Sequence, residues 1–212
     1  MTDLELSIAI EELLVSRNLR GMQTARAALE PGYYLRAAQH LRQLRGTVLI
    51  ATGFPVSGTF ETDGPVGAIA LYDCMKDQGA DPVLACGAPL SETLDQDYRL
   101  LKLRARDIED AAAEARSHLE ALAPQAVISI ERPGLSEDGR YYNMRGDDIT
   151  DHCAIFDPFI DQATCPTIAI GDGGNEIGMG NIAAAIATLD ITAATTTCDE
   201  LLVADVSNWG AY

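Results

Sequence analysis

The stretch from Thr167 to Asn181, TIAIGDGGNEIGMGN, constrains the fold more than any other part of the sequence. An apolar, β-branched run leads into closely spaced glycines that carry Asp172, Asn175 and Glu176, and residues typical of a helix follow. α/β proteins present polar sites at the carboxyl edge of a sheet with this order of strand, glycine turn and helix. A tight turn whose glycines serve geometry alone is the alternative, but the three polar residues favour a functional loop.

Short apolar runs alternate with helical patterns from Thr47 onward. The periodicity predicts helices over 68–78 and 107–122, and strands over 47–52, 82–86, 126–130, 167–170 and 201–206. This alternation predicts an α/β domain at 47–212, with a Rossmann-like, mostly parallel sheet and helices on both faces. Few residues follow the last predicted strand, so we expect the domain to lack a last helix.

Residues 1–46 are predicted to form an N-terminal helical extension that packs on this domain. A helix is expected over 4–16, with Leu6, Ile10, Leu13 and Leu14 on one apolar face turned toward the core. A second helix is expected after the Pro31-Gly32 pair.

The charge balance excludes two classes of partner. Lys and Arg total 15 against 32 Asp and Glu, which gives a formal net charge of −17. Nucleic acids and anionic membranes bind positive surfaces, so neither is an expected main partner. The five cysteines form no C-x-x-C pair, and no signal peptide or membrane-length apolar run is visible. We therefore expect a cytoplasmic protein with reduced thiols, and the sequence leaves homo-oligomerisation open.

Carboxylates and amides follow four of the predicted strands. Each acid alone is explained by a solvated loop or a helix cap, but together they favour a site, because the carboxyl ends of parallel strands share one edge. The sequence requires no cofactor. If the acids hold Mg²⁺, then Asp63, Asp172 and Asp205 are the first candidate ligands, as carboxylate oxygens suit this ion.

Known nucleotide motifs fit the glycine turn poorly. The dinucleotide fingerprint fails because Glu176 stands where its last glycine is required, and the P-loop fails because Met179-Gly180 replaces its lysine and hydroxyl residue. A nucleotide-binding Rossmann-like enzyme is therefore the weakest of the functional alternatives. The three histidines lack metal-ligand spacing, which argues against zinc.

Several ordered segments resemble the D-glutamate cyclase family. The resemblance spans about Thr47 to the end of the chain, and its ten-residue glycine motif is specific. The matching segments are Thr52–Phe54, Glu61–Pro65, Gly67-Ala68, Ile130–Gly134, Asp138-Gly139, Tyr142–Gly146, Gly171–Gly180 and Val206–Gly210. The resemblance implies a lyase that cyclises D-glutamate to 5-oxo-D-proline with loss of water.

That chemistry needs a base, an acid, donors for an oxyanion and a carboxylate anchor. The expected roles are assigned to residues in the matching segments: Asp172 or Glu176 as base, Glu131 or Asp63 as acid, the amides of Gly173 and Gly174 with Asn175 at the oxyanion, and Arg132 or Arg145 at the α-carboxylate. Asn208 is expected at the same substrate-binding edge. The alternative function is a non-catalytic α/β module that binds an acidic metabolite or Mg²⁺ there.

Overall fold

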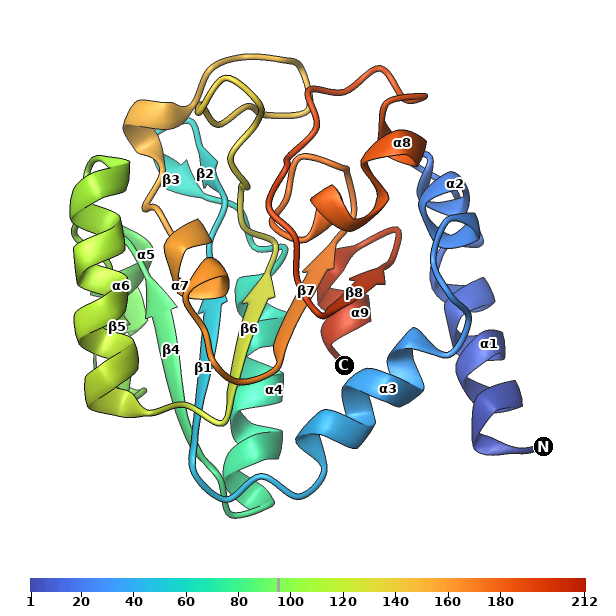
Figure 1. Cartoon of the computed structure of the whole chain (residues 1–212), viewed down its shortest axis with the longest axis horizontal. Helices are drawn as coiled ribbons and strands as arrows, with labels where there is room; N and C mark the ends of the chain where they lie inside the picture. Colours follow the sequence, from blue (N-terminus) through green and yellow to red (C-terminus); the bar gives the residue numbers. More distant parts are fainter. Residues whose placement is uncertain (95) are drawn as a thin grey trace.

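The computed structural model describes residues 1–94 and 96–212 and contains a six-stranded sheet in which all pairs are parallel (Figure 1). The sheet order is β5-β4-β1-β6-β7-β8. This confirms the predicted α/β class and Rossmann-like parallel sheet. Its strands are β1 (Thr47–Thr52), β4 (Asp81–Cys86), β5 (Leu100–Lys102), β6 (Ala126–Ile130), β7 (Thr167–Gly171) and β8 (Glu200–Val203), and β2 (Pro55–Val56) pairs separately with β3 (Thr59–Phe60).

Helices cover both faces of the sheet. In Figure 1, α4 lies behind the strands, and α7 with α6 lies in front of them. The α-helices of the described chain are α1 (Asp3–Leu14), α2 (Met22–Ala27), α3 (Tyr33–Leu41), α4 (Pro65–Asp77), α5 (Leu90–Leu94), α6 (Ile108–Leu122), α7 (Asp157–Asp161), α8 (Ala183–Ile186) and α9 (Ser207–Ala211), with 3₁₀ turns at Thr150–His152 and Met179–Ile182.

The strand order creates a switch point between β1 and β6. The chain begins the sheet at its centre, adds β4 and β5 on one side, and then adds β6, β7 and β8 on the other. Thr52 and Ile130 are paired at the ends of their strands, so the loops that follow β1 and β6 leave the sheet at the same level. Ligands of open α/β sheets bind at such a point, outside the carboxyl ends of the strands.

The central strands supply a fully buried core, with Ile50, Leu84 and Ile128 inaccessible to solvent. Strand β5 was missed from the sequence because it is only three residues long and carries a lysine at its end. The helix expected directly after the glycine turn is a 3₁₀ turn followed by the four-residue α8.

The expected inward face of the first helix was wrong. Leu13 is 70% exposed, and Leu6 and Ile10 are also exposed, whereas Ser7 and Glu11 are buried. The carboxylate of Glu11 accepts hydrogen bonds from the Ser7 hydroxyl at 2.8 Å and the Gly32 amide at 2.9 Å. This polar pair joins α1 to the start of α3, so tertiary hydrogen bonding reversed the face that periodicity favours.

No helix of the described residues is long and apolar enough to cross a membrane.

Candidate functional site

Three carboxylates converge at the switch point. Oxygens of Asp63, Glu131 and Asp172 lie within 4.8 Å of one another, and we call these residues the acidic cluster. Asp63 lies in the loop before α4, whereas Glu131 and Asp172 directly follow β6 and β7. The side chains of Glu131 and Asp172 are buried, and Asp63 is partly exposed. The three predicted acids therefore share one small space.

Asp63 and Asn208 hold the loops around the acidic cluster in place. The carboxylate of Asp63 accepts the backbone N–H groups of Ser207 at 3.1 Å and Asn208 at 2.7 Å, at the start of α9. The amide oxygen of Asn208 in turn accepts the N–H groups of Gly64 at 3.0 Å and Gly67 at 2.7 Å, at the start of α4. These bonds satisfy amides that helix starts leave without partners. The side-chain oxygen of Asn208 is therefore already engaged in capping α4. Its substrate-binding role stays a prediction.

Glu131 adopts a backbone conformation unusual for its residue type. Its φ of 47° lies in the left-handed region that favours glycine. The side chain accepts a hydrogen bond from the Ser207 hydroxyl, which ties β6 to α9. Residues held in such conformations occur often at functional sites, where surrounding contacts enforce them.

The glycine turn wraps around Glu176. One carboxylate oxygen of Glu176 accepts the N–H of Gly174 at 2.7 Å. A Cβ added at Gly173 would lie 2.8 Å from the other carboxylate oxygen, so a larger residue there would require the Glu176 side chain to shift. The side-chain amide of Asn175 donates to the carbonyl of Tyr142 at 2.8 Å, and its oxygen is buried without a partner. Two of the predicted oxyanion donors are thus engaged within the protein.

Burial and mutual repulsion raise the pKa values of these acids. The pKa of Asp172 is raised to about 8, first by burial and then by the negative charge of Glu176, while Arg20 opposes the shift. Burial, with the charges of Asp172 and Glu176, raises the pKa of Glu131 well above its usual range. Glu61 is raised to about 7 by burial and the charge of Asp63. Carboxyl groups that hold protons near neutral pH can act as acids and bases.

Arg20 is the site residue that sequence reasoning missed. Its guanidinium pairs with the carboxylate of Asp172 and is 38% exposed, whereas the Asp172 side chain is 4% exposed. Arg20 therefore stands on the solvent side of the acidic cluster. It lies in the loop between α1 and α2, far along the chain from every recognised motif, and no local pattern marks it.

Asp205 positions the loop that carries Arg20. Its carboxylate accepts the backbone N–H groups of Arg17 at 2.8 Å, Asn18 at 3.1 Å and Leu19 at 3.1 Å. The predicted ligand role of Asp205 is thus not matched by its position, because its oxygens face this loop and the acidic cluster contains Glu131 instead.

The two predicted arginines lie in different settings. Arg132 is fully buried, and its terminal nitrogens donate to the carbonyls of Thr52, at 2.7 Å, and Ala154. Its guanidinium also lies 5.4 Å from the centre of the Phe156 ring. Arg145 is exposed on the long loop after β6. The structure gives neither arginine a contact with the acidic cluster, and their substrate roles stay predictions.

The donor set of the acidic cluster suits a hard divalent cation. Three carboxylates at this spacing are typical oxygen ligands for Mg²⁺, and Glu131 takes the place that the sequence assigned to Asp205. Arg20 already supplies a positive charge on Asp172, so a cation there would compete with the guanidinium.

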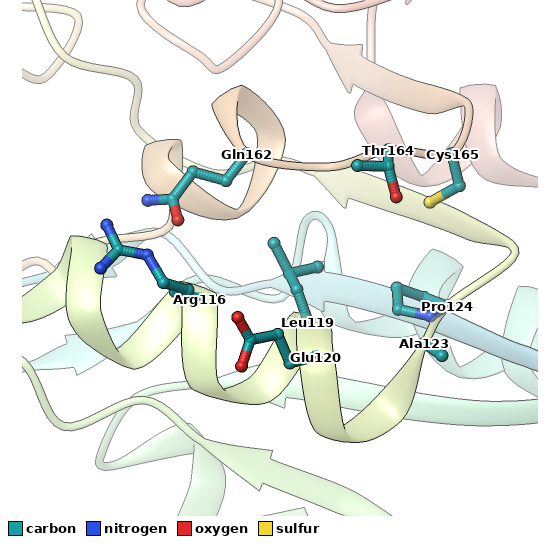
Figure 2. A pocket seen from close by; sticks show the side chains of 8 residues that line it. All are labelled: Arg116, Leu119, Glu120, Ala123, Pro124, Gln162, Thr164 and Cys165. Carbon is teal, nitrogen blue, oxygen red and sulfur yellow. The ribbon is translucent and has the colours of Figure 1, made fainter.

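The cavity in Figure 2 lies at the opposite end of the sheet. It has a volume of about 380 Å³ and lies between the end of α6 and the segment that leads into β7. Pro124 and Cys165, which line it, precede β6 and β7. It is therefore at the amino edge of the sheet and separate from the acidic cluster.

The parallel sheet and the acidic cluster at its switch point define a Rossmann-like α/β domain with a buried carboxylate site. The family described as D-glutamate cyclase-like, C-terminal, matches residues 10–212. The chain belongs to this family, which confirms the resemblance seen in the sequence. The match begins at residue 10, so it includes most of the N-terminal extension and Arg20.

Two known proteins illustrate the extent of similarity. The human mitochondrial D-glutamate cyclase is 32% identical over 206 residues, which cover 84% of this chain and 33% of that protein. The chain thus matches about a third of the length of that relative. A solved structure of aldohexose dehydrogenase from Thermoplasma acidophilum is 9% identical and covers 62% of this chain and 51% of that chain, with a TM-score of 0.34.

Proposed function

We propose that this protein cyclises D-glutamate to 5-oxo-D-proline with loss of water. The observation that carries the proposal is the convergence of Asp63, Glu131 and Asp172 within 4.8 Å, in a chain that belongs to the D-glutamate cyclase-like family. The reaction joins the α-amino nitrogen to the γ-carboxyl carbon and breaks one carbon–oxygen bond. Two protons leave the ammonium group, and both end on the departing oxygen as water.

Asp172 is the proposed base. Its raised pKa, about 8, leaves a fraction ionised at neutral pH and makes that fraction basic enough to accept a proton from an ammonium group. It also lies under the partly exposed Arg20, where a substrate would enter. Glu176 is the alternative base, but it faces the amide of Gly174 beneath the turn.

Glu131 is the proposed acid. Burial raises the pKa of its carboxyl well above the usual range, which favours the protonated form, and a protonated carboxyl can donate to the departing oxygen. The Ser207 hydroxyl holds one of its oxygens, which fixes the direction of the group. Asp63, within 4.8 Å of both other acids, is the alternative acid.

Arg20 is the proposed anchor for the substrate carboxylate. Guanidinium groups bind carboxylates with two parallel hydrogen bonds, and Arg20 stands beside the proposed base. A substrate would replace part of its ion pair with Asp172, which frees the base at the moment of binding. Arg145 is a second proposed contact, from the exposed loop.

The product decides between this proposal and a binding module. The purified protein is incubated with D-glutamate, and 5-oxo-D-proline is measured by chiral chromatography, with L-glutamate as the control substrate. Appearance of product above the uncatalysed rate, and its loss in Asp172→Asn, are expected. A rise in melting temperature with D-glutamate and no product would instead identify a non-catalytic module.

A further inference from the structure

A second polar site lies at the carboxyl ends of β4 and β5, on the other side of β1 from the acidic cluster. It is a hollow of about 330 Å³, formed by the turn after β4, the strip that continues β5, and His152. An adjoining hollow of about 260 Å³ shares Ala88, Arg106 and His152 with it. We call the two hollows together the basic pocket. Their size is that of a site for a small ligand.

Solvent exposure alternates along the strip that continues β5. Leu101 and Leu103 are buried, whereas Arg104 and Arg106 are exposed. The N–H of Leu103 donates to the last carbonyl of β4 at 3.0 Å, which extends the parallel pairing past Lys102. Side chains two residues apart on an extended strand share a face. Lys102, Arg104 and Arg106 all line the hollow.

This concentration of positive charge contrasts with the rest of the chain. Only 15 lysines and arginines are present against 32 acids, yet three of the 15 line one hollow. Among the described residues that line the basic pocket, the acids are Glu92 and Asp151. Positive charge in a concave site focuses the field and attracts anions.

The two arginines are available for a ligand. No ion pair joins Arg104 or Arg106 to the described part of the chain. The nearby carboxylate of Glu114 instead accepts the backbone N–H of Arg104 at 3.1 Å and that of Ala105 at 3.3 Å. Glu114 thus fixes the backbone of the strip, and both arginines line the hollow.

We propose that the basic pocket binds a compact dianion, a phosphate monoester or a dicarboxylate, as a second ligand of this protein. Two guanidinium groups match the paired oxygens of either head group. No Phe, Tyr or Trp is among the described lining residues, so the pocket offers no stacking surface for a nucleobase. The inference is independent of the proposed cyclase activity, because the acidic cluster does not line this pocket.

Thermal unfolding tests the proposal with inorganic phosphate and succinate as probes and sodium chloride at equal ionic strength as the reference. Binding of one probe is expected to raise the melting temperature by roughly 2–4 °C over the chloride reference. The double variant Arg104→Gln/Arg106→Gln is expected to lose this rise. Arg42→Gln/Arg116→Gln removes the same charge from exposed positions elsewhere and is expected to keep it.

Three results would overturn the proposal. They are no shift with either probe, an equal shift in both double variants, or loss of D-glutamate binding in Arg104→Gln/Arg106→Gln. The last result would make the pocket part of the substrate site. A melting-temperature shift with phosphate but not with succinate assigns the ligand to phosphate esters. A shift with succinate but not with phosphate assigns it to dicarboxylates. Isothermal titration of the folded variants with the same probes separates lost binding from lost stability.

Discussion

The guanidinium of Arg20, in the N-terminal extension, forms an ion pair with the carboxylate of Asp172 at the end of β7. This contact brings a segment that precedes the sheet into the candidate site. It also places the positive charge on the solvent side of the acidic cluster, where the proposed acidic substrate would arrive. The extension is therefore expected to contribute to function as well as to packing.

Replacement of the proposed base is expected to abolish turnover. Asp172→Asn keeps the size of the side chain but cannot accept the substrate proton, so kcat should fall by roughly 10²- to 10⁴-fold. Asp77→Asn removes an exposed acid from the end of α4 and should leave kcat unchanged. Initial rates of 5-oxo-D-proline formation measure both. Turnover by Asp172→Asn at the parent rate would assign the base to Glu176 or to another group.

Loss of the proposed anchor is expected to weaken substrate binding. Arg20→Gln should raise KM for D-glutamate roughly tenfold or more, because a charge-assisted hydrogen bond is lost. Asp205→Asn should raise KM in the same direction, since it loosens the loop that carries Arg20.

The double variant tests whether the two residues act together. If Asp205 acts through Arg20, the effects of Asp205→Asn and Arg20→Gln on KM should be far from additive. Additive effects would show that Asp205 has only a structural role. Melting temperatures of the three variants check that each remains folded.

Stability is expected to fall as the pH rises toward 8. The folded-state pKa of Asp172 is raised to about 8 from its ordinary value of 3.8, so the folded state binds more protons than the unfolded state between these values. The free energy of unfolding must then decrease with pH across this window. Asp172→Asn removes the titration, so it should match the parent at low pH and exceed it by roughly 1–3 kcal/mol above pH 8. Urea unfolding at pH 5 and pH 9 measures the difference, and a parent that gains stability relative to the variant at pH 9 would contradict it.

A divalent cation is expected to compete with Arg20 for the acidic cluster. Arg20→Gln leaves the carboxylates without the guanidinium, so Mg²⁺ should bind this variant more tightly than the parent. Asp63→Asn in the same background should reverse the gain by removing one ligand. Isothermal titration with MgCl₂ at pH 8.5 tests the order of affinities. Equal Mg²⁺ affinity in the parent and in Arg20→Gln would argue against a cation site here.

The end of the glycine turn should tolerate no side chain. A Cβ at Gly180 would lie 2.1 Å from the carbonyl oxygen of Thr195, which is part of the backbone and cannot rotate away. Gly180→Ala is therefore expected to lower the free energy of unfolding by about 1–3 kcal/mol through overpacking. Gly58→Ala, which meets nothing within 4 Å but has a φ of +79°, should cost less. Urea unfolding of both variants measures the two costs, and equal losses would assign the cost to backbone strain instead.

The sequence by itself determined the parallel α/β sheet, the family and the loops that carry Asp63, Glu131 and Asp172. These features are local: apolar runs define the strands, glycines define the turn, and parallel strands end at one edge by necessity. The apolar periodicity predicted the wrong buried face for α1. Glu11 is buried there because its carboxylate accepts a hydrogen bond from the Gly32 amide, which lies outside α1.

Only the tertiary structure decided how the site is completed. Arg20 reaches Asp172 because Asp205 fixes the loop from Arg17 to Leu19, and no sequence period links positions so far apart. The capping role of Asn208 and the buried setting of Arg132 were likewise fixed by partners that are distant in the sequence. The pKa values of the acids follow from burial and spacing, which depend on three-dimensional packing and not on residue type.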